Sequence, residues 1–96
     1  MTSSPASQPE PYRYTLAPRA QRQLDALPDR IAVAIAEFIA VRLVTNPRRI
    51  GKPLARELAG QWSAHIGDHR VLYEMDDINK QIRITRIGPR ADIYRP

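Results

Sequence analysis

Residues 61–75 alternate between apolar and polar positions, and this pattern predicts a β-hairpin. The turn is expected at Gly67–Asp68, because Gly adopts positive φ at no steric cost and Asp tolerates it. This turn would pair Trp62 with Tyr73, Ala64 with Val71, His65 with Arg70, and Ile66 with His69. Successive side chains point to opposite faces of a strand, so the hairpin has an apolar face and a basic, hydrogen-bonding face. The apolar face is expected to carry Trp62, Ala64, Val71, Tyr73 and, near the turn, His69; the basic face carries Ser63, His65 and Arg70.

Upstream of this hairpin, the pattern predicts one strand followed by two helices. Residues Tyr12–Leu16 alternate as a strand does. Pro18 suits the first turn of a helix, and apolar residues follow it at helical spacing. Pro28 interrupts this helix, and a second helix is expected from Asp29 to the Asn46–Pro47 step, which disfavours helical angles. So short a break predicts an antiparallel pair of helices.

The second helix is apolar on more than one side, and this has two interpretations. It is either packed between the sheet and the first helix, or part of its surface receives another protein chain. The expected core stripe is Ile31, Ile35, Phe38 and Ile39, whereas Val33, Ala40, Val41 and Val44 lie off that stripe.

Downstream segments complete a small α+β fold. Thr45–Gly60 is interpreted as a long basic connection, Asp76–Asn79 as a loop, Lys80–Ile87 as the last strand and Arg90–Pro96 as a short tail. The expected order is an N-terminal strand, an α-helical hairpin and a three-stranded antiparallel meander that completes one sheet. The helices should cover one face of the sheet and leave the other open and basic.

The pairing of the last strand follows from continued antiparallel register. It should turn Ile82 and Ile84 toward the core. It should also bring Arg83 near Leu72 and Thr85 near Arg70 on the open face.

Length and composition indicate a single domain in the cytoplasm. A chain of 96 residues with 43% hydrophobic positions builds one core, expected over residues 12–96. Residues 1–11, rich in Pro and Ser, are expected to form a disordered leader. The absence of Cys excludes disulfides and thiolate chemistry, and no signal pattern or run long enough to span a membrane is seen.

The net charge says more about possible binding partners than the overall composition does. The net charge is +5 with a pI near 10.2, and Arg dominates among the 15 cations. Arg grips phosphate in two places, which favours a phosphate-bearing or acidic protein partner; the alternative is a solvated surface that only maintains solubility. The cations gather in two runs: Arg42, Arg48, Arg49, Lys52 and Arg56, and then Lys80, Arg83, Arg86, Arg90 and Arg95.

The chemistry available to this basic face is limited but specific. His65 and His69 lack a third ligand of suitable type, so neither a metal nor another cofactor is expected. RNA cleavage by attack of the substrate's own 2′-hydroxyl needs a base, an acid and cations that hold the developing charge, and it needs no metal. A His beside an Arg is suited to that reaction.

Several short motifs, in their order along the chain, resemble the RelE/ParE toxin superfamily. They are Gly51–Leu54, Leu58–Ser63, Gly67–Tyr73, Ile87–Arg90 and Tyr94–Arg95, within a similarity that spans Tyr12 to Arg95. The resemblance implies the toxin of a bacterial type II toxin–antitoxin pair, bound in a hetero-oligomer by a helical antitoxin that wraps its surface. The RelE-like branch is the most similar, and it implies a metal-independent endoribonuclease that cuts messenger RNA on the ribosome.

The resemblance also assigns roles to residues. Arg70 would stabilise the phosphate, Arg90 the attacking or leaving oxygen, and Tyr94 would stack on a base or assist proton transfer, while His65 would act as base or phosphate anchor. The residues expected to contact RNA or the ribosome are Lys52, Arg48, Arg49, Arg56, Arg83 and Arg86.

Other interpretations of these residues and of the function stay open at this stage. Arg70 can instead form an ion pair with Glu74 on the same strand face, and Tyr94 can simply pin the tail. Ser63, His69 and Pro89 depart from residues common in the superfamily, which implies lower activity or a different acid–base assignment. The alternative functions are a ParE-like inhibitor of DNA gyrase without nuclease activity, and a weakly active module that binds RNA or antitoxin.

Overall fold

A computed structural model describes residues 11–93 of the chain. The predicted leader at residues 1–11 falls almost entirely outside this range, and so do Tyr94 and Arg95. The elements are β1 (Arg13–Leu16), α1 (Pro18–Asp25), α2 (Asp29–Glu37), the π-helical turn η2 (Phe38–Leu43), α3 (Pro47–Ile50), β2 (Lys52–Pro53), the 3₁₀ turn η3 (Arg56–Leu58), β3 (Trp62–Ile66), β4 (His69–Asp76), β5 (Gln81–Pro89) and α4 (Arg90–Ile93).

The strands form one five-stranded sheet in the order β1-β5-β4-β3-β2. β1 runs parallel to β5, and the other neighbours are antiparallel. The predicted α+β fold, with a helical hairpin and a three-stranded meander, is confirmed. Among the described residues no helix is long and apolar enough to cross a membrane.

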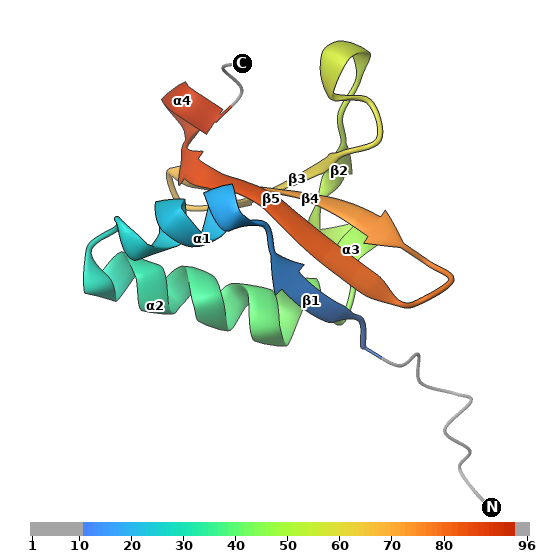
Figure 1. The fold of residues 1–96 in the computed structure, drawn as a ribbon, viewed down its shortest axis with the longest axis horizontal. Coiled ribbons are helices and arrows are strands. Elements are labelled where there is room, and N and C mark those ends of the chain that lie inside the picture. Colours follow the sequence, from blue (N-terminus) through green and yellow to red (C-terminus); the bar gives the residue numbers. More distant parts are fainter. Residues whose placement is uncertain (1–10, 94–96) are drawn as a thin grey trace, which may run out of the picture.

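The helices cover one face of the sheet, as Figure 1 shows for α1 and α2. The core beneath them joins helical residues to the inner faces of β3, β4 and β5. Tyr73, Ile82 and Ile84 are fully buried there, as the alternation predicted. The predicted packing of the second helix against the sheet is confirmed for Ile35 and Ile39, which are also buried.

The second helix differs from expectation in its last turn and in its outer face. Residues 38–43 form a π turn, in which the Val44 amide donates to the Ile39 carbonyl over 3.2 Å. The wider π turn directs both Leu43 and Val44 toward the sheet, where they are buried. In an α turn these two consecutive side chains would point about 100° apart, and Val44 would lie farther from the core. Packing against the sheet does not account for Val33 and Val41, which are 58% and 66% exposed.

The predicted connection at Thr45–Gly60 is wrong, because it contains α3, β2 and η3. β2 is two residues long and includes a Pro, so it carries no alternation that sequence reasoning could detect. Only its pairing with β3 makes it a strand. The predicted tail likewise begins with a helical turn, held by the Arg90 amide, which donates to the Asp68 carbonyl over 2.9 Å.

The predicted register of the last strand is also wrong, because β5 contains a bulge. Leu72 lies opposite Arg86 and Tyr73 opposite Ile84, which leaves Thr85 as an extra residue. The bulge restores the core orientation of Ile87, which is buried although it stands three positions after Ile84. Thr85 still lies near Leu72, whose carbonyl accepts a hydrogen bond from its hydroxyl over 3.3 Å.

The bulge changes which residues of β4 and β5 lie opposite one another on the open face. Arg83 pairs across the sheet with Glu74 and not with Leu72. Gly88, and not Thr85, lies opposite Arg70.

Candidate functional site

The open face of the sheet has a pocket of about 300 Å³ at its β2–β3–β4 edge. Four polar residues from three neighbouring strands line it, together with apolar residues of the segment that leads into and out of β2. The lining residues are Lys52, Ser63, His65 and Arg70, with Ile50, Pro53 and Leu54.

The hairpin between β3 and β4 brings His65 and Arg70 together. They are directly opposite in the predicted register, and Gly67 has φ +56° in the turn that fixes it. The Arg70 guanidinium donates to the carbonyls of Gly67, at 3.4 Å, and His69, at 3.2 Å, which draws it toward the turn. Glu74, the other partner considered for Arg70, instead forms an ion pair with Arg83, with 3.7 Å between Glu74 Oε1 and Arg83 Nη1.

Lys52 reaches the same pocket from β2. It pairs with Ser63 of β3, so its side chain joins the row of polar residues on the open face. The pocket therefore combines two cations and an imidazole with an apolar wall. An anion with an attached apolar ring, such as a nucleotide, fits this combination of groups.

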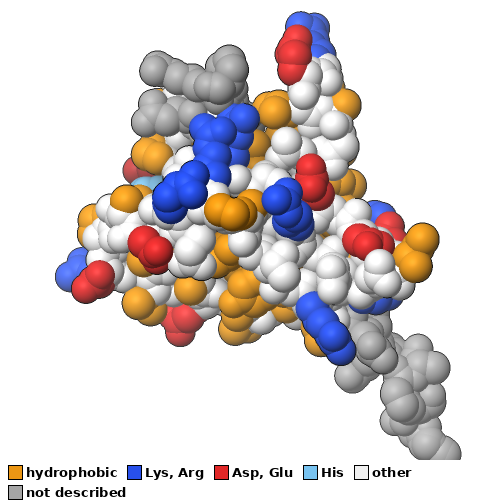
Figure 2. Space-filling view, in the orientation of Figure 1, with side chains coloured by type: hydrophobic (Ala, Val, Ile, Leu, Met, Phe, Trp, Pro, Cys, Tyr) orange, Lys and Arg blue, Asp and Glu red, His pale blue; other side chains and the backbone are white. Residues whose placement is uncertain are grey.

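A second group of candidate residues lies toward α4. Arg86 follows the bulged residue Thr85 in β5, and the bulge places its side chain near α4. The Arg86 guanidinium donates to the Ile93 carbonyl over 3.2 Å. Figure 2 shows Lys and Arg side chains gathered over α1 and the end of β5, beside α4. Arg86 also lines a cavity of about 240 Å³ with Arg19 and Gln23 of α1 and Ile93 of α4. Tyr94, the predicted aromatic of the site, follows directly but lies outside the described residues.

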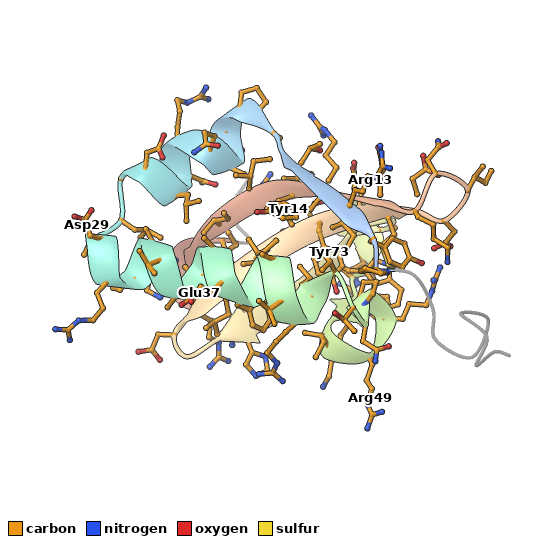
Figure 3. All side chains as sticks on the ribbon, turned by 90° about the horizontal axis from the view of Figure 1, so that it is seen from below. Arg13, Tyr14, Asp29, Glu37, Arg49 and Tyr73 are labelled. Carbon is orange, nitrogen blue, oxygen red and sulfur yellow. The ribbon has the colours of Figure 1, made fainter. Side chains whose placement is uncertain are left out.

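The structure separates four predicted RNA contacts from the pocket. Arg48 binds Asp77 in the turn after β4, and Arg83 binds Glu74. Arg49 points away from the body of the protein (Figure 3). Arg56 lies in η3, within the segment that projects beyond the sheet in Figure 1.

The Arg48–Asp77 pair is part of an exposed cluster with Tyr12. The Tyr12 hydroxyl donates to Asp77 Oδ1 over 2.7 Å, and Lys80 lies 5.0 Å from the centre of the Tyr12 ring. Hydrogen bonds from Arg48 and Tyr12 lower the pKa of Asp77 to about 2, and Asp77 in turn raises the pKa of Arg48. The cluster ties the start of β1 to α3 and to the β4–β5 turn.

Three comparisons with known proteins bear on this arrangement. A family model described as the ParE toxin of the type II toxin–antitoxin system parDE matches residues 14–94. The chain belongs to this toxin family. It is 47% identical over 85 residues to toxin RelG of Mycobacterium tuberculosis, covering 88% of this chain and 98% of RelG. It is 42% identical over 89 residues to toxin RelE of the same organism, covering 93% and 92% of the two chains.

A solved structure shares the fold of this toxin-family chain. The toxin–antitoxin complex RelBE2 of Mycobacterium tuberculosis contains a chain with a TM-score of 0.81 and 43% identity, covering 84% of this chain and 100% of that one. The resemblance found in the sequence is confirmed. Within residues 11–93 the toxin fold holds no group of three or more His, Cys, Asp or Glu side chains that is suited to a metal ion.

Sequence reasoning missed the apolar wall of the pocket. Ile50 and Leu54 flank Lys52 in the segment that leads into and out of β2, and the pairing of β2 with β3 brings this segment to the pocket. No local signal marks them, since a two-residue strand has no periodicity. The motif Gly51–Leu54 was the only trace of this wall in the sequence.

Proposed function

We propose that this protein is a ribosome-dependent endoribonuclease that cleaves messenger RNA without a metal ion, as the toxin of a type II toxin–antitoxin pair. The observation that carries the proposal is the pocket in which Lys52, His65 and Arg70 converge on the open face of the sheet. The identity to the toxins RelG and RelE supports it at the level of the family.

The chemistry follows from the groups in the pocket. The 2′-hydroxyl of the substrate gives its proton to a base and attacks the adjacent phosphorus, while the bond from phosphorus to the 5′-oxygen breaks and that oxygen takes a proton. This leaves a 2′,3′-cyclic phosphate and a 5′-hydroxyl. His65 is the base or a phosphate anchor, Arg70 stabilises the charge on the phosphate, and Lys52 docks the RNA. The resemblance to the RelE-like branch adds two roles to this proposal. Arg90 supports the attacking or leaving oxygen, and Tyr94 stacks on an RNA base or assists proton transfer.

Two assays on the purified protein test this function. The protein is added to a translation extract, the 5′ ends of a message are mapped, and a DNA gyrase supercoiling assay runs in parallel. Cuts that recur at one position within codons and vanish without ribosomes are expected. Blocked supercoiling with an intact message would contradict the proposal and favour the gyrase inhibitor.

Arg70→Ala should lower the rate of cleavage by about 100-fold or more, because a donor aimed at charge that develops in the transition state contributes on this scale. Arg70→Lys keeps the positive charge but loses the planar guanidinium, so its cleavage rate should lie between the rates of the wild type and of Arg70→Ala. The matched control is Arg13→Ala, which removes an exposed Arg from β1 at the opposite edge of the sheet. Unchanged cleavage by a folded Arg70→Ala variant would show that the site lies elsewhere.

We also propose that the toxin is held in the cytoplasm by a cognate helical antitoxin in a hetero-oligomer. The support is the similar chain in the RelBE2 structure, which is a toxin–antitoxin complex. Expression of the toxin alone should arrest growth, and co-expression of the protein encoded beside it should restore growth and co-purify with it. Failure of that neighbour to bind would exclude it as the partner.

A further inference from the structure

Tyr73 is a buried tyrosine whose hydroxyl extends from the sheet to the backbone of α3. It is fully buried on the helix side of β4, and its hydroxyl donates to the Pro47 carbonyl over 2.7 Å. Figure 3 shows Tyr73 beneath the end of the second helix, beside α3. Burial raises the pKa of Tyr73, so the hydroxyl keeps its proton and remains a donor across the physiological range.

The Pro47 carbonyl is shared between Tyr73 and Gly51. The Gly51 amide donates to the same oxygen over 3.2 Å and closes the single turn of α3. A Cβ at Gly51 would stand 1.9 Å from the Tyr73 hydroxyl oxygen, although the backbone at Gly51 is extended and open to any residue. Space against Tyr73, and not the dihedral angles, therefore requires glycine here.

Lys52 follows Gly51 directly and begins β2. This edge strand pairs Lys52 with Ser63 and Pro53 with Trp62, and the Leu54 amide donates to the Gln61 carbonyl over 2.8 Å, so the ladder is short and begins at Lys52 itself. The contact of Tyr73 with Pro47 and Gly51 lies one residue away on the buried side. It orders the chain at the point where Lys52 enters the pocket.

We propose that Tyr73 is a positioning residue, whose hydroxyl holds the Pro47–Gly51 turn so that Lys52 meets the RNA backbone in the pocket. The inference rests on the proposed function, because Lys52 is taken there as a docking contact. It assigns to a core tyrosine a role in substrate binding in addition to its packing.

The test uses Tyr73→Phe, which removes one hydroxyl and keeps the ring. Cleavage kinetics on ribosomes are compared for the wild type, Tyr73→Phe, Lys52→Ala and the double variant. Tyr73→Phe should raise KM about three- to tenfold and leave kcat within about twofold, because a docking contact acts on binding. In the Lys52→Ala background the substitution should change KM no further, because it acts through Lys52.

A matched control removes a hydroxyl elsewhere. Tyr14→Phe removes the hydroxyl of an exposed tyrosine in β1, at the far edge of the sheet, and should leave KM unchanged. Amide hydrogen exchange gives a readout that does not depend on cleavage. Residues 47–54 should exchange faster in Tyr73→Phe and at the wild-type rate in Tyr14→Phe.

The outcomes separate this inference from the proposed function. If the wild type cleaves and Tyr73→Phe has no effect on KM, or an effect that adds fully to that of Lys52→Ala, the positioning role is overturned and the nuclease stands. If the wild type does not cleave, the nuclease proposal fails and hydrogen exchange decides: faster exchange confined to residues 47–54 supports the positioning of Lys52, and unchanged exchange overturns it. Should Tyr73→Phe fail to fold, Gly51→Ala replaces it in the same cycle, and its effect on KM should likewise disappear in the Lys52→Ala background.

Discussion

At the scale of single residues, hydrogen-bond partners separate the cations of this protein into distinct roles. Arg70 is drawn to the turn by backbone carbonyls and stays on the wall of the pocket. Arg48 and Arg83 bind carboxylates elsewhere on the surface. A charge that already has a carboxylate partner offers less to a phosphate, so the net charge alone overstates the surface available to RNA.

The depressed pKa of Asp77 predicts an acid-dependent contribution to stability. Its folded pKa of about 2 lies below the ordinary value near 3.8, so the contribution is complete above about pH 4 and is lost as pH falls toward 2. The melting temperature of the wild type should therefore fall more steeply between pH 4 and pH 2 than that of Asp77→Asn, and the two curves should converge near pH 2. Thermal unfolding monitored by circular dichroism across this range measures both slopes.

Asp25→Asn serves as the control, because Asp25 accepts a hydrogen bond from the neutral amide of Gln21. It should keep the wild-type slope. The difference at Asp77 should also shrink in high salt, since the pair is exposed and therefore screened. Equal slopes for the wild type and Asp77→Asn at low salt would contradict the assignment.

At the scale of elements, two short features set the open face. The bulge at Thr85 in β5 turns Arg86 away from the core while Ile84 and Ile87 remain buried. The short β2 adds Lys52 to the edge of the sheet and closes the pocket. Neither feature has the length or periodicity of a regular element, yet both decide which side chains meet.

Gly51→Ala should destabilise the fold by about 2 kcal/mol, as overpacking of a tight contact does. Adding Tyr73→Phe removes the atom at 1.9 Å and leaves the ring carbon at 2.9 Å, so the combined loss should be smaller than the sum of the single losses. Urea unfolding of the four proteins measures the coupling. Full additivity would show that Gly51 and Tyr73 do not share this contact.

At the scale of the whole molecule, the fold places its hydrophobic core and its candidate pocket on opposite faces of the sheet. The helices and the core occupy one side, and the pocket lies on the other. The alternation that buries Ala64, Val71 and Tyr73 on the helix side places Ser63, His65 and Arg70 on the side of the pocket, where Leu72 is buried as well. The net charge of +5 then favours association with a polyanion.

Binding of the toxin to ribosomes that carry an uncleavable message should weaken as salt rises. If Lys52 neutralises one phosphate, Lys52→Ala should lower the slope of log K against log salt concentration by roughly 0.7 to 1. Arg13→Ala removes the same charge from the far edge of the sheet and should leave the slope unchanged. Equal slopes for Lys52→Ala and the wild type would argue against a phosphate contact at Lys52.

The sequence by itself determined the order of the main elements, the hairpin register and the two faces of β3 and β4. These depend on local alternation and on the turn at Gly67–Asp68, where side-chain period and backbone preference act within a few residues. It also predicted the family, and it placed His65 beside Arg70. The roles of these residues, and that of Tyr94, remain predictions for the experiments above.

Only the tertiary structure decided the wall of the pocket and the arrangement of side chains on the rest of the open face. The bulge in β5, the pairing of β2 and the contact between Tyr73 and Gly51 each join residues that are distant in sequence or too few to form a pattern. Their positions follow from filling the core and satisfying buried hydrogen bonds, which are properties of the packed molecule and not of any short segment. Lys52, one of two lysines in an Arg-rich chain, reaches the pocket because a buried tyrosine supports the turn before it.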